Sequence, residues 1–260
     1  MTLFKAPILA AMFASGALAL ATDPAPAFAQ AESAEESDDA MSKPLVIEIK
    51  RGEVIQIIAP QARADGNEAR QAYYTAAFPI AEKFGYEKEG QLAVRQKVVS
   101  DYDPGGLLFY SWPNAAAAKA FANHPGWPAL KAERPKAWNE LKIYTSELDE
   151  DLRLTFDPAK FYTVVIAWGN PENPDDYERY LSGIEPAVKR SGGRFIYKMR
   201  NPEFEAHASS PEAPVQLTFV EWDDPAGFAA VQSSEEYLAS RQYFSTGLTR
   251  FEFYWLEHRP

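Results

Sequence analysis

The polar residues best placed for chemistry lie on two segments of alternating sequence, 215–222 and 249–256. Because side chains alternate between the two faces of a β-strand, Leu217 and Phe219 share one face and the polar residues beside them share the other. We expect the apolar pair to face helices and the polar face to point toward a second sheet. Basic residues of segment 194–200 extend the polar set. The candidate ligand-binding residues are Tyr254, Glu252, Gln216, Thr218, Lys198 and Arg194.

These six residues combine hydroxyl, carboxyl, amide and basic groups. Such a set can hold a small carbonyl compound, phenol or acid, with Tyr254 or Glu252 as hydrogen-bonding or proton-transfer groups. A satisfied polar network without a ligand is the competing interpretation, because buried polar groups normally bond to one another. The catalytic residues therefore stay open.

Other kinds of site find little support. The chain has 3 histidines and no cysteine, and no histidine has a second one at ligand spacing, so we expect no metal site and no disulfide. The pair Gly105-Gly106 precedes a predicted strand instead of opening a helix, which argues against a phosphate-binding loop. We expect no cofactor. Haem is the alternative, with His124 as candidate axial ligand, although its Asn-His-Pro-Gly-Trp context favours a turn.

The charge of the chain limits its partners. The net charge is −11, from 37 acidic and 26 strongly basic residues. Nucleic-acid binding relies on clustered Lys and Arg side chains, and the sequence has no such cluster. We therefore expect a small-molecule ligand and no nucleic acid, and the oligomeric state stays open.

The N-terminus is typical of a signal peptide. Residues 1–29 carry an early Lys5, an apolar run and the small-residue cleavage pattern Ala27-Phe28-Ala29. We expect cleavage near Ala29, with cleavage after Ala21 as an alternative, and a periplasmic or secreted product. The apolar run is short and contains a proline, so a stable membrane anchor is not expected. Residues 30–42 are acidic and lack large apolar side chains, which predicts a disordered leader.

The remaining sequence matches itself at an offset of 110 residues, with an offset of 107 around the first helix. The order of the matches favours two copies of a unit of about 100 residues. The offset of 110 also lays segment 54–58 over segment 164–168. The matched pairs are Leu107/Leu217, Phe109/Phe219, Trp112/Trp222 and Tyr144/Tyr254 at 110, and Tyr73/Tyr180 and Gly85/Gly192 at 107.

Each half predicts the order strand, helix, strand, strand, helix, strand, which is that of a ferredoxin-like unit. A sheet with helices on one face needs cover on the other face, and two units can cover each other. We predict an α+β fold of two ferredoxin-like βαββαβ repeats packed sheet to sheet as an intramolecular pseudo-dimeric α/β barrel. The first repeat spans 43–147, a connector 148–160 and the second repeat 161–260. The predicted strands are 53–59, 91–99, 107–112, 141–146, 161–168, 194–200, 215–222 and 249–256, with helices at 67–84 and 114–138, a helix capped by Asn173 with Pro174 at its first position, and a helix opened by Asp224-Pro225.

The second half contains a further set of motifs: Asp176-Tyr177 at a helix start, Pro186, Ser191-Gly192-Gly193-Arg194, a strand ending at Phe219, and Ser233-Ser234-Glu235-Glu236-Tyr237 before Arg241. Through these motifs, residues 161–256 resemble a small, functionally uncharacterised family within the dimeric α/β-barrel superfamily. The first half matches that family by architecture more than by motif. The resemblance implies paired sheets. The wider superfamily includes cofactor-free monooxygenases, lactone isomerases, haem-dependent peroxidases and stress-induced proteins.

These observations together predict a periplasmic protein that binds a small organic molecule between its two sheets. The alternatives are a cofactor-independent oxygenase or isomerase and a non-catalytic, stress-associated interaction protein. A space between the sheets lined by Tyr254, Glu252 and Gln216 supports binding there, whereas a filled interior contradicts it.

Overall fold

The computed structural model describes residues 43–210 and 212–259. The signal peptide and the acidic leader predicted for 1–29 and 30–42 lie outside these residues. Within the described part of the chain, every helix is too short or too polar to cross a lipid bilayer.

The first half forms a ferredoxin-like unit. Its four strands lie in the order β5-β2-β4-β3 within one larger sheet, and all neighbours are antiparallel. This order places the first and third strands of the unit at its centre, where both are mostly buried. Its elements are β2 (Val54–Ala62), α2 (Asn67–Ala81), the short 3-10 helix η2 (Glu82–Phe84), β3 (Glu87–Val99), β4 (Gly106–Trp112), α3 (Ala115–Ala122), α4 (Trp127–Ala137) and β5 (Trp138–Glu147).

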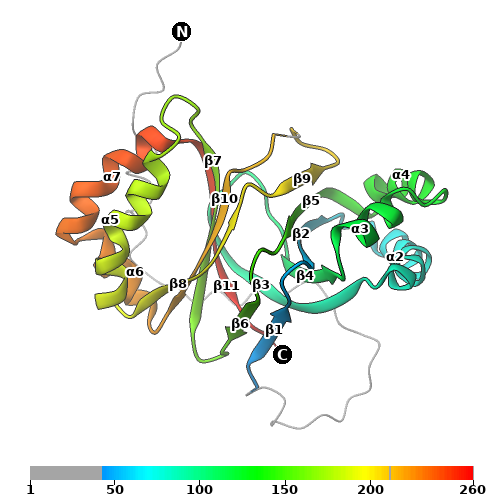
Figure 1. Ribbon diagram of the computed structural model, residues 1–260, viewed down its shortest axis with the longest axis horizontal. Coiled ribbons are helices and arrows are strands. Elements are labelled where there is room, and N and C mark those ends of the chain that lie inside the picture. Colours follow the sequence, from blue (N-terminus) through cyan, green and yellow to red (C-terminus); the bar gives the residue numbers. More distant parts are fainter. Residues whose placement is uncertain (1–42, 211, 260) are drawn as a thin grey trace. The chain divides into compact units, whose positions relative to one another are not determined.

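The second half repeats this element order with strand order β11-β7-β10-β8. The helices of this half lie together against one face of its strands (Figure 1). The predicted fold of two ferredoxin-like units is thereby confirmed. The elements are β7 (Phe161–Gly169), α5 (Asp176–Arg190), β8 (Gly193–Arg200), β9 (Glu203–Ala206), β10 (Gln216–Trp222), α6 (Pro225–Gln232), α7 (Glu235–Gly247) and β11 (Leu248–Glu257).

The two units share strands as well as a core. The first part of β3 pairs with β4 of its own unit, and the part beyond Ala93 pairs with β11 of the second unit. In the second unit the chain passes from β8 through Asn201, whose φ is 45°, into β9, and β9 pairs with β5 of the first unit. The sequence predicts strands at 194–200 and 215–222 with none between them, so β9 is a correction. A four-residue strand with one exposed and three half-buried residues carries too weak a pattern to be recognised in the sequence.

A two-stranded ribbon fills the space between the units. It pairs β1 (Leu45–Ile49) with β6 (Leu152–Phe156), and β6 lies inside the segment 148–160 that was predicted as a connector. Ile47 and Phe156 of this ribbon are fully buried. Both strands contribute to the same hydrophobic cluster as the central strands of the two sheets.

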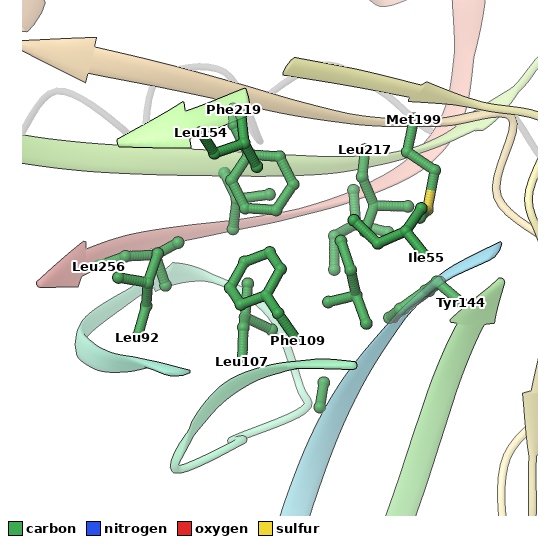
Figure 2. Close-up of a cluster of buried hydrophobic side chains, with 14 of the residues drawn as sticks. Ile55, Leu92, Leu107, Phe109, Tyr144, Leu154, Met199, Leu217, Phe219 and Leu256 are labelled. Atoms are coloured by element: carbon green, nitrogen blue, oxygen red, sulfur yellow. The ribbon is translucent and has the colours of Figure 1, made fainter. Parts of the chain in front are cut away.

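The core between the sheets is continuous and apolar. Phe109 of β4 and Phe219 of β10 point toward one another, with ring centroids 6.1 Å apart (Figure 2). Leu217 and Phe219 therefore face the other sheet, and the prediction that they face helices is wrong. Both faces of β10 are buried, so alternation of polarity along it does not tell the two faces apart.

Side-chain caps fix the starts of α3 and α6, whereas α5 starts elsewhere than its sequence predicts. The side chain of Asn114 accepts a hydrogen bond from the backbone N–H of Ala117 at 2.9 Å, and Asp224 accepts one from Ala226 at 2.7 Å. The Asp224-Pro225 start of α6 is confirmed. By contrast, α5 begins at Asp176 and not at Asn173-Pro174. The side-chain amide of Asn173 instead donates to the carbonyl of Thr246, 3.4 Å away.

Strand pairing also corrects the internal alignment of the first strand. Val54 pairs with Trp112, and Phe161 pairs with Trp222. The offset between β2 and β7 is therefore 107 and not 110, so segment 54–58 corresponds to 161–165. The offset of 110 holds from β4 and β10 onward. Three extra residues thus lie in the β8-to-β10 segment, where the second unit carries β9.

Candidate functional site

The six predicted site residues do not meet in one place. Glu252 and Tyr254 lie inside the barrel, where the Nζ of Lys142 is 2.6 Å from Glu252 Oε1. The hydroxyl of Tyr254 lies 3.0 Å from Glu252 Oε2 and 2.8 Å from the Oγ of Ser100. These groups form a buried, internally satisfied network among apolar side chains.

The other four predicted residues take part in separate contacts. Gln216 donates to Thr218 at 2.7 Å, and Thr218 lies 3.2 Å from the hydroxyl of Tyr177 on α5, which places this pair on the helix side of the sheet. The Nζ of Lys198 lies 3.0 Å from Glu178 Oε1 and the Nε of Arg194 lies 2.9 Å from Glu221 Oε1. Between the two units the described residues form a buried hydrophobic cluster, and Tyr254 belongs to it.

A cavity of about 750 Å³ lies elsewhere, between the sheet of the first unit and its helices α2, α3 and α4. None of the six predicted residues lines it. Its buried walls are dominated by aromatic side chains, and its exposed lining residues come from α3 on one side and from the ends of β5 and β9 on the other. The aromatic lining residues are Tyr73, Tyr74, Phe78, Tyr86, Tyr110, Trp112, Phe121, Trp127, Trp138 and Phe204.

Small side chains keep this space open. In the second unit, Phe228 of α6 packs against Phe253 and Trp255 of β11, with ring centroids 5.2 and 5.6 Å away. At the offset of 110, Ala118 stands in the place of Phe228, and the strand residues are Ile143 and Thr145. The first unit therefore has three smaller residues where the second has a packed aromatic cluster. All three line the cavity.

The far wall is a stack of aromatic rings. Tyr86 and Tyr110 lie parallel, with centroids 4.7 Å apart, and Trp112 is 4.3 Å from Tyr86 on the other side. At a second wall, the rings of Trp138 and Tyr73 pack edge to face, with their centroids 5.0 Å apart. Such surfaces favour planar, apolar ligands, because aromatic pairs gain from both burial and ring geometry.

One polar chain runs along the sheet at the cavity. The hydroxyl of Tyr86 donates to Gln56 Oε1 at 2.9 Å, and Gln56 Nε2 donates to the hydroxyl of Thr145 at 3.2 Å. Burial raises the pKa of Tyr86 well above its ordinary value, and neighbouring Tyr110 adds to the shift. Tyr86 is therefore a neutral phenol at physiological pH and acts as a hydrogen-bonding group, not as a base.

Two indole N–H groups in these walls have no hydrogen-bond partner within the described residues. They belong to Trp112 and Trp138, both almost fully buried. In the second unit the equivalent Trp222 donates to the hydroxyl of Thr163 at 3.0 Å. The residue in the place of Thr163 is Gln56, which is engaged with Tyr86 and Thr145 instead. An unpaired buried donor costs about 1–3 kcal/mol, so this wall is less well satisfied than its counterpart.

The lining offers hydrogen bonding more readily than proton transfer. Among the described lining residues the carboxylates are Glu147, Glu203 and Glu205, and the first two are exposed. No group of three or more His, Asp or Glu side chains suited to a metal ion occurs in the described chain. His124 lies in the turn between α3 and α4, where its Nδ1 accepts from the backbone N–H of Gly126 at 3.1 Å.

One protein-family model matches the second unit. Residues 162–250 match a family described as Domain of unknown function (DUF1330). This match excludes the unit that holds the cavity. No curated protein matches the chain.

Several solved structures are similar to this chain at low sequence identity. A protein of unknown function from Rhodopseudomonas palustris is 17% identical, with a TM-score of 0.34, over 38% of this chain and 83% of its own. An anthrone oxidase-like protein is 10% identical, with a TM-score of 0.46, over 82% of this chain and 95% of its own. A mutant chlorite dismutase from Candidatus Nitrospira defluvii is 9% identical, with a TM-score of 0.42, over 81% of this chain and 92% of its own.

The sequence did contain a signal for the cavity. The internal alignment pairs Ala118 with Phe228, a loss of volume at a helix position that faces the sheet. Strand alternation alone led instead to the polar face of β11. The lining residues come from seven helices and strands, so the comparison of the two units within the fold is what singles them out.

Proposed function

We propose that the first unit binds a small, mainly apolar aromatic molecule in the cavity under α2, α3 and α4. The observation that carries this proposal is the contrast between the two units: one helix–sheet space is filled by Phe228, and the other is open beside Ala118. Binding between the two sheets, as expected from the sequence, is replaced by binding between sheet and helices.

The size and walls of the cavity support this proposal. A volume of about 750 Å³ lies within the range of small-molecule sites, and aromatic walls with a few polar groups are characteristic of such sites. Burying about 200 Å² of apolar ligand surface contributes roughly 5 kcal/mol before the costs of association. We therefore expect a Kd of about 0.2 mM or weaker for simple planar compounds, and tighter binding of the physiological ligand.

Filling the cavity tests the proposal. The probe is N-phenyl-1-naphthylamine, a neutral aromatic dye whose fluorescence rises in apolar surroundings. The wild-type protein should bind it saturably with a 1:1 stoichiometry. Ala118→Phe introduces the ring that fills the second unit, so it should weaken binding at least about tenfold, a loss of about 1.4 kcal/mol.

The matched control is Ala116→Phe on the same helix. Ala116 is exposed and does not line the cavity, so this variant adds an equal ring without filling the space. Its affinity for the dye should equal that of the wild-type protein. Equal binding by Ala118→Phe, with a melting temperature close to that of the wild type, contradicts the proposal.

We also propose that the protein acts outside the inner membrane after removal of residues 1–29. The cleavage pattern at Ala27-Phe28-Ala29 supports export, and Gln30 would then be the first residue. The intact mass of the protein from a periplasmic extract should correspond to a start at Gln30. A mass that retains Met1 and Lys5 contradicts export by this signal.

A further inference from the structure

The wall of the cavity contains a nearly buried cation. The side chain of Arg134 on α4 is 5% exposed and lines the cavity. Its Nε donates to the hydroxyl of Tyr73 at 3.1 Å, and its guanidinium carbon lies 4.9 Å from the ring centre of Trp127. Burial raises the pKa of Tyr73 while the positive charge of Arg134 opposes the rise. The phenol is thus a neutral acceptor that fixes the guanidinium in place.

The counter-charge comes from the other unit. Glu205 on β9 forms a hydrogen-bonded ion pair with Nη1 of Arg134 and also lines the cavity. Lys131 contacts the same carboxylate oxygen at 3.0 Å, but its side chain is 41% exposed. A solvated cation of this kind adds little to the pairing energy. Glu205 is therefore the anion that balances the buried guanidinium.

This pairing bears on the charge of the ligand. A guanidinium carries five N–H donors, and Tyr73 and Glu205 engage two of the nitrogens that bear them. A neutral acceptor can use a remaining donor without disturbing the ion pair. A ligand carboxylate at Arg134 would place a second negative charge beside Glu205, and the two like charges would repel. Glu147, Glu203 and Lys119 also line the cavity, but these three residues are exposed and solvent screens their charges.

From these contacts we infer that the cavity selects neutral aromatic molecules with a hydrogen-bond acceptor, and that Glu205 sets this selectivity by occupying Arg134. The inference rests on the proposed function, since it names the class of ligand for that same cavity. It makes β9, which the second unit contributes, the element that determines specificity in the first unit.

Two probes of equal shape test the inference. They are 2-acetylnaphthalene, which is a neutral ketone, and 2-naphthoate, which is a carboxylate, measured separately by equilibrium dialysis at pH 7.5. The wild-type protein should bind the ketone at least about tenfold more tightly than the carboxylate. Glu205→Gln should tighten carboxylate binding and reduce this ratio at least about fivefold, because it leaves Arg134 without its anion.

The matched control is Glu133→Gln. This residue precedes Arg134 on α4, is exposed and does not line the cavity. The variant removes one negative charge close to Arg134, so a general field effect would alter both variants alike. The ratio for Glu133→Gln should stay within about twofold of the wild-type ratio. Circular dichroism and melting curves establish that both variants are folded.

The outcomes separate the two proposals. Equal affinity of the wild-type protein for both probes, or equal shifts in the two variants, overturns the role of Glu205 and leaves binding in the cavity standing. Binding of neither probe, together with no difference between Ala118→Phe and the wild type toward the dye, overturns the proposed function and this inference with it.

Discussion

At the scale of single residues, the barrel interior contains a charged pair that a core of this kind rarely holds. Lys142 and Glu252 are 5% and 6% exposed, and the Nζ of Lys142 also lies 4.1 Å from the ring centre of Tyr102. Burial raises the pKa of Tyr254, and the charge of Glu252 raises it further, so Tyr254 stays a neutral hydrogen-bonding partner of that carboxylate. The network explains how the polar groups of Glu252 and Tyr254 are accommodated in a buried position.

Breaking this pair should be costly. Lys142→Met leaves the carboxylate of Glu252 buried without its cation, and we expect a loss of about 3–5 kcal/mol in the free energy of unfolding. The double variant Lys142→Met/Glu252→Leu removes both charges and should lose clearly less than the single variant. Urea denaturation measures both. Equal losses in the single and double variants would mean that packing, not charge, dominates this position.

At the scale of elements, the carboxylate of Glu140 ties the residues that follow β9 to the first unit. Glu140 Oε1 at the start of β5 accepts backbone hydrogen bonds from Leu141 at 2.9 Å, His207 at 3.0 Å and Ala208 at 3.2 Å. Burial tends to raise the pKa of Glu140, but hydrogen bonds from Ser209 and from these backbone groups outweigh it, and the net pKa is lowered. The ionised carboxylate is thus the form that fastens this segment.

This shift predicts a pH dependence. Because the folded-state pKa lies below the ordinary value of 4.5, the stabilisation by Glu140 is fully present above about pH 4.5 and disappears as the pH falls through the lowered pKa. Glu140→Gln should lower the melting temperature at pH 7 and show a smaller further decrease between pH 5 and 3.5 than the wild type. The exposed Glu133→Gln is the control. Parallel curves for Glu140→Gln and the wild type contradict this role.

The same scale shows what the sequence predicts well. Long central strands such as β7 and the capped start of α6 carry strong local patterns, and both were predicted within a residue or two. The ribbon strands β1 and β6 and the short β9 were missed, because each gains its stability from pairing with a distant segment. The start of α5 was misplaced because Asn173 bonds to Thr246 across the fold instead of capping its own helix.

At the scale of the whole molecule, each unit covers the apolar face of the other. Residues of both sheets and of the ribbon belong to one buried cluster, and Phe109 and Phe219 meet across it. The internal sequence matches predict this doubling of the fold, because they recur in the same order in both halves. The position of the cavity was not predicted, because the alternation on β10 does not distinguish its two buried faces and because the lining residues come from many elements.

A unit expressed without the other unit should self-associate through its exposed apolar face. Residues 157–260 alone would expose Leu217 and Phe219, so we expect this fragment to self-associate at micromolar concentrations. Size-exclusion chromatography with light scattering measures its mass. Introducing Phe219→Glu into the fragment should reduce self-association, since a charge would then lie on the exposed face. A monomeric fragment with a cooperative melting transition contradicts mutual dependence of the units.

The sharing of β3 and of the β8–β9 segment has one further consequence. The end of a sheet normally leaves a row of free backbone groups on which a foreign chain can add a strand. Here the nine-strand order begins with β8 and ends with β9, which follow one another along the chain, so the two ends of the hydrogen-bonded ladder belong to one continuous segment. Both strands pair with one neighbour each, β8 with β10 and β9 with β5, so each still presents one row of backbone groups. Arg194, Lys198 and Arg200 place three positive charges on β8, and charged side chains on an edge strand disfavour the addition of a foreign strand. Charge on the longer edge thereby opposes fibre-like assembly.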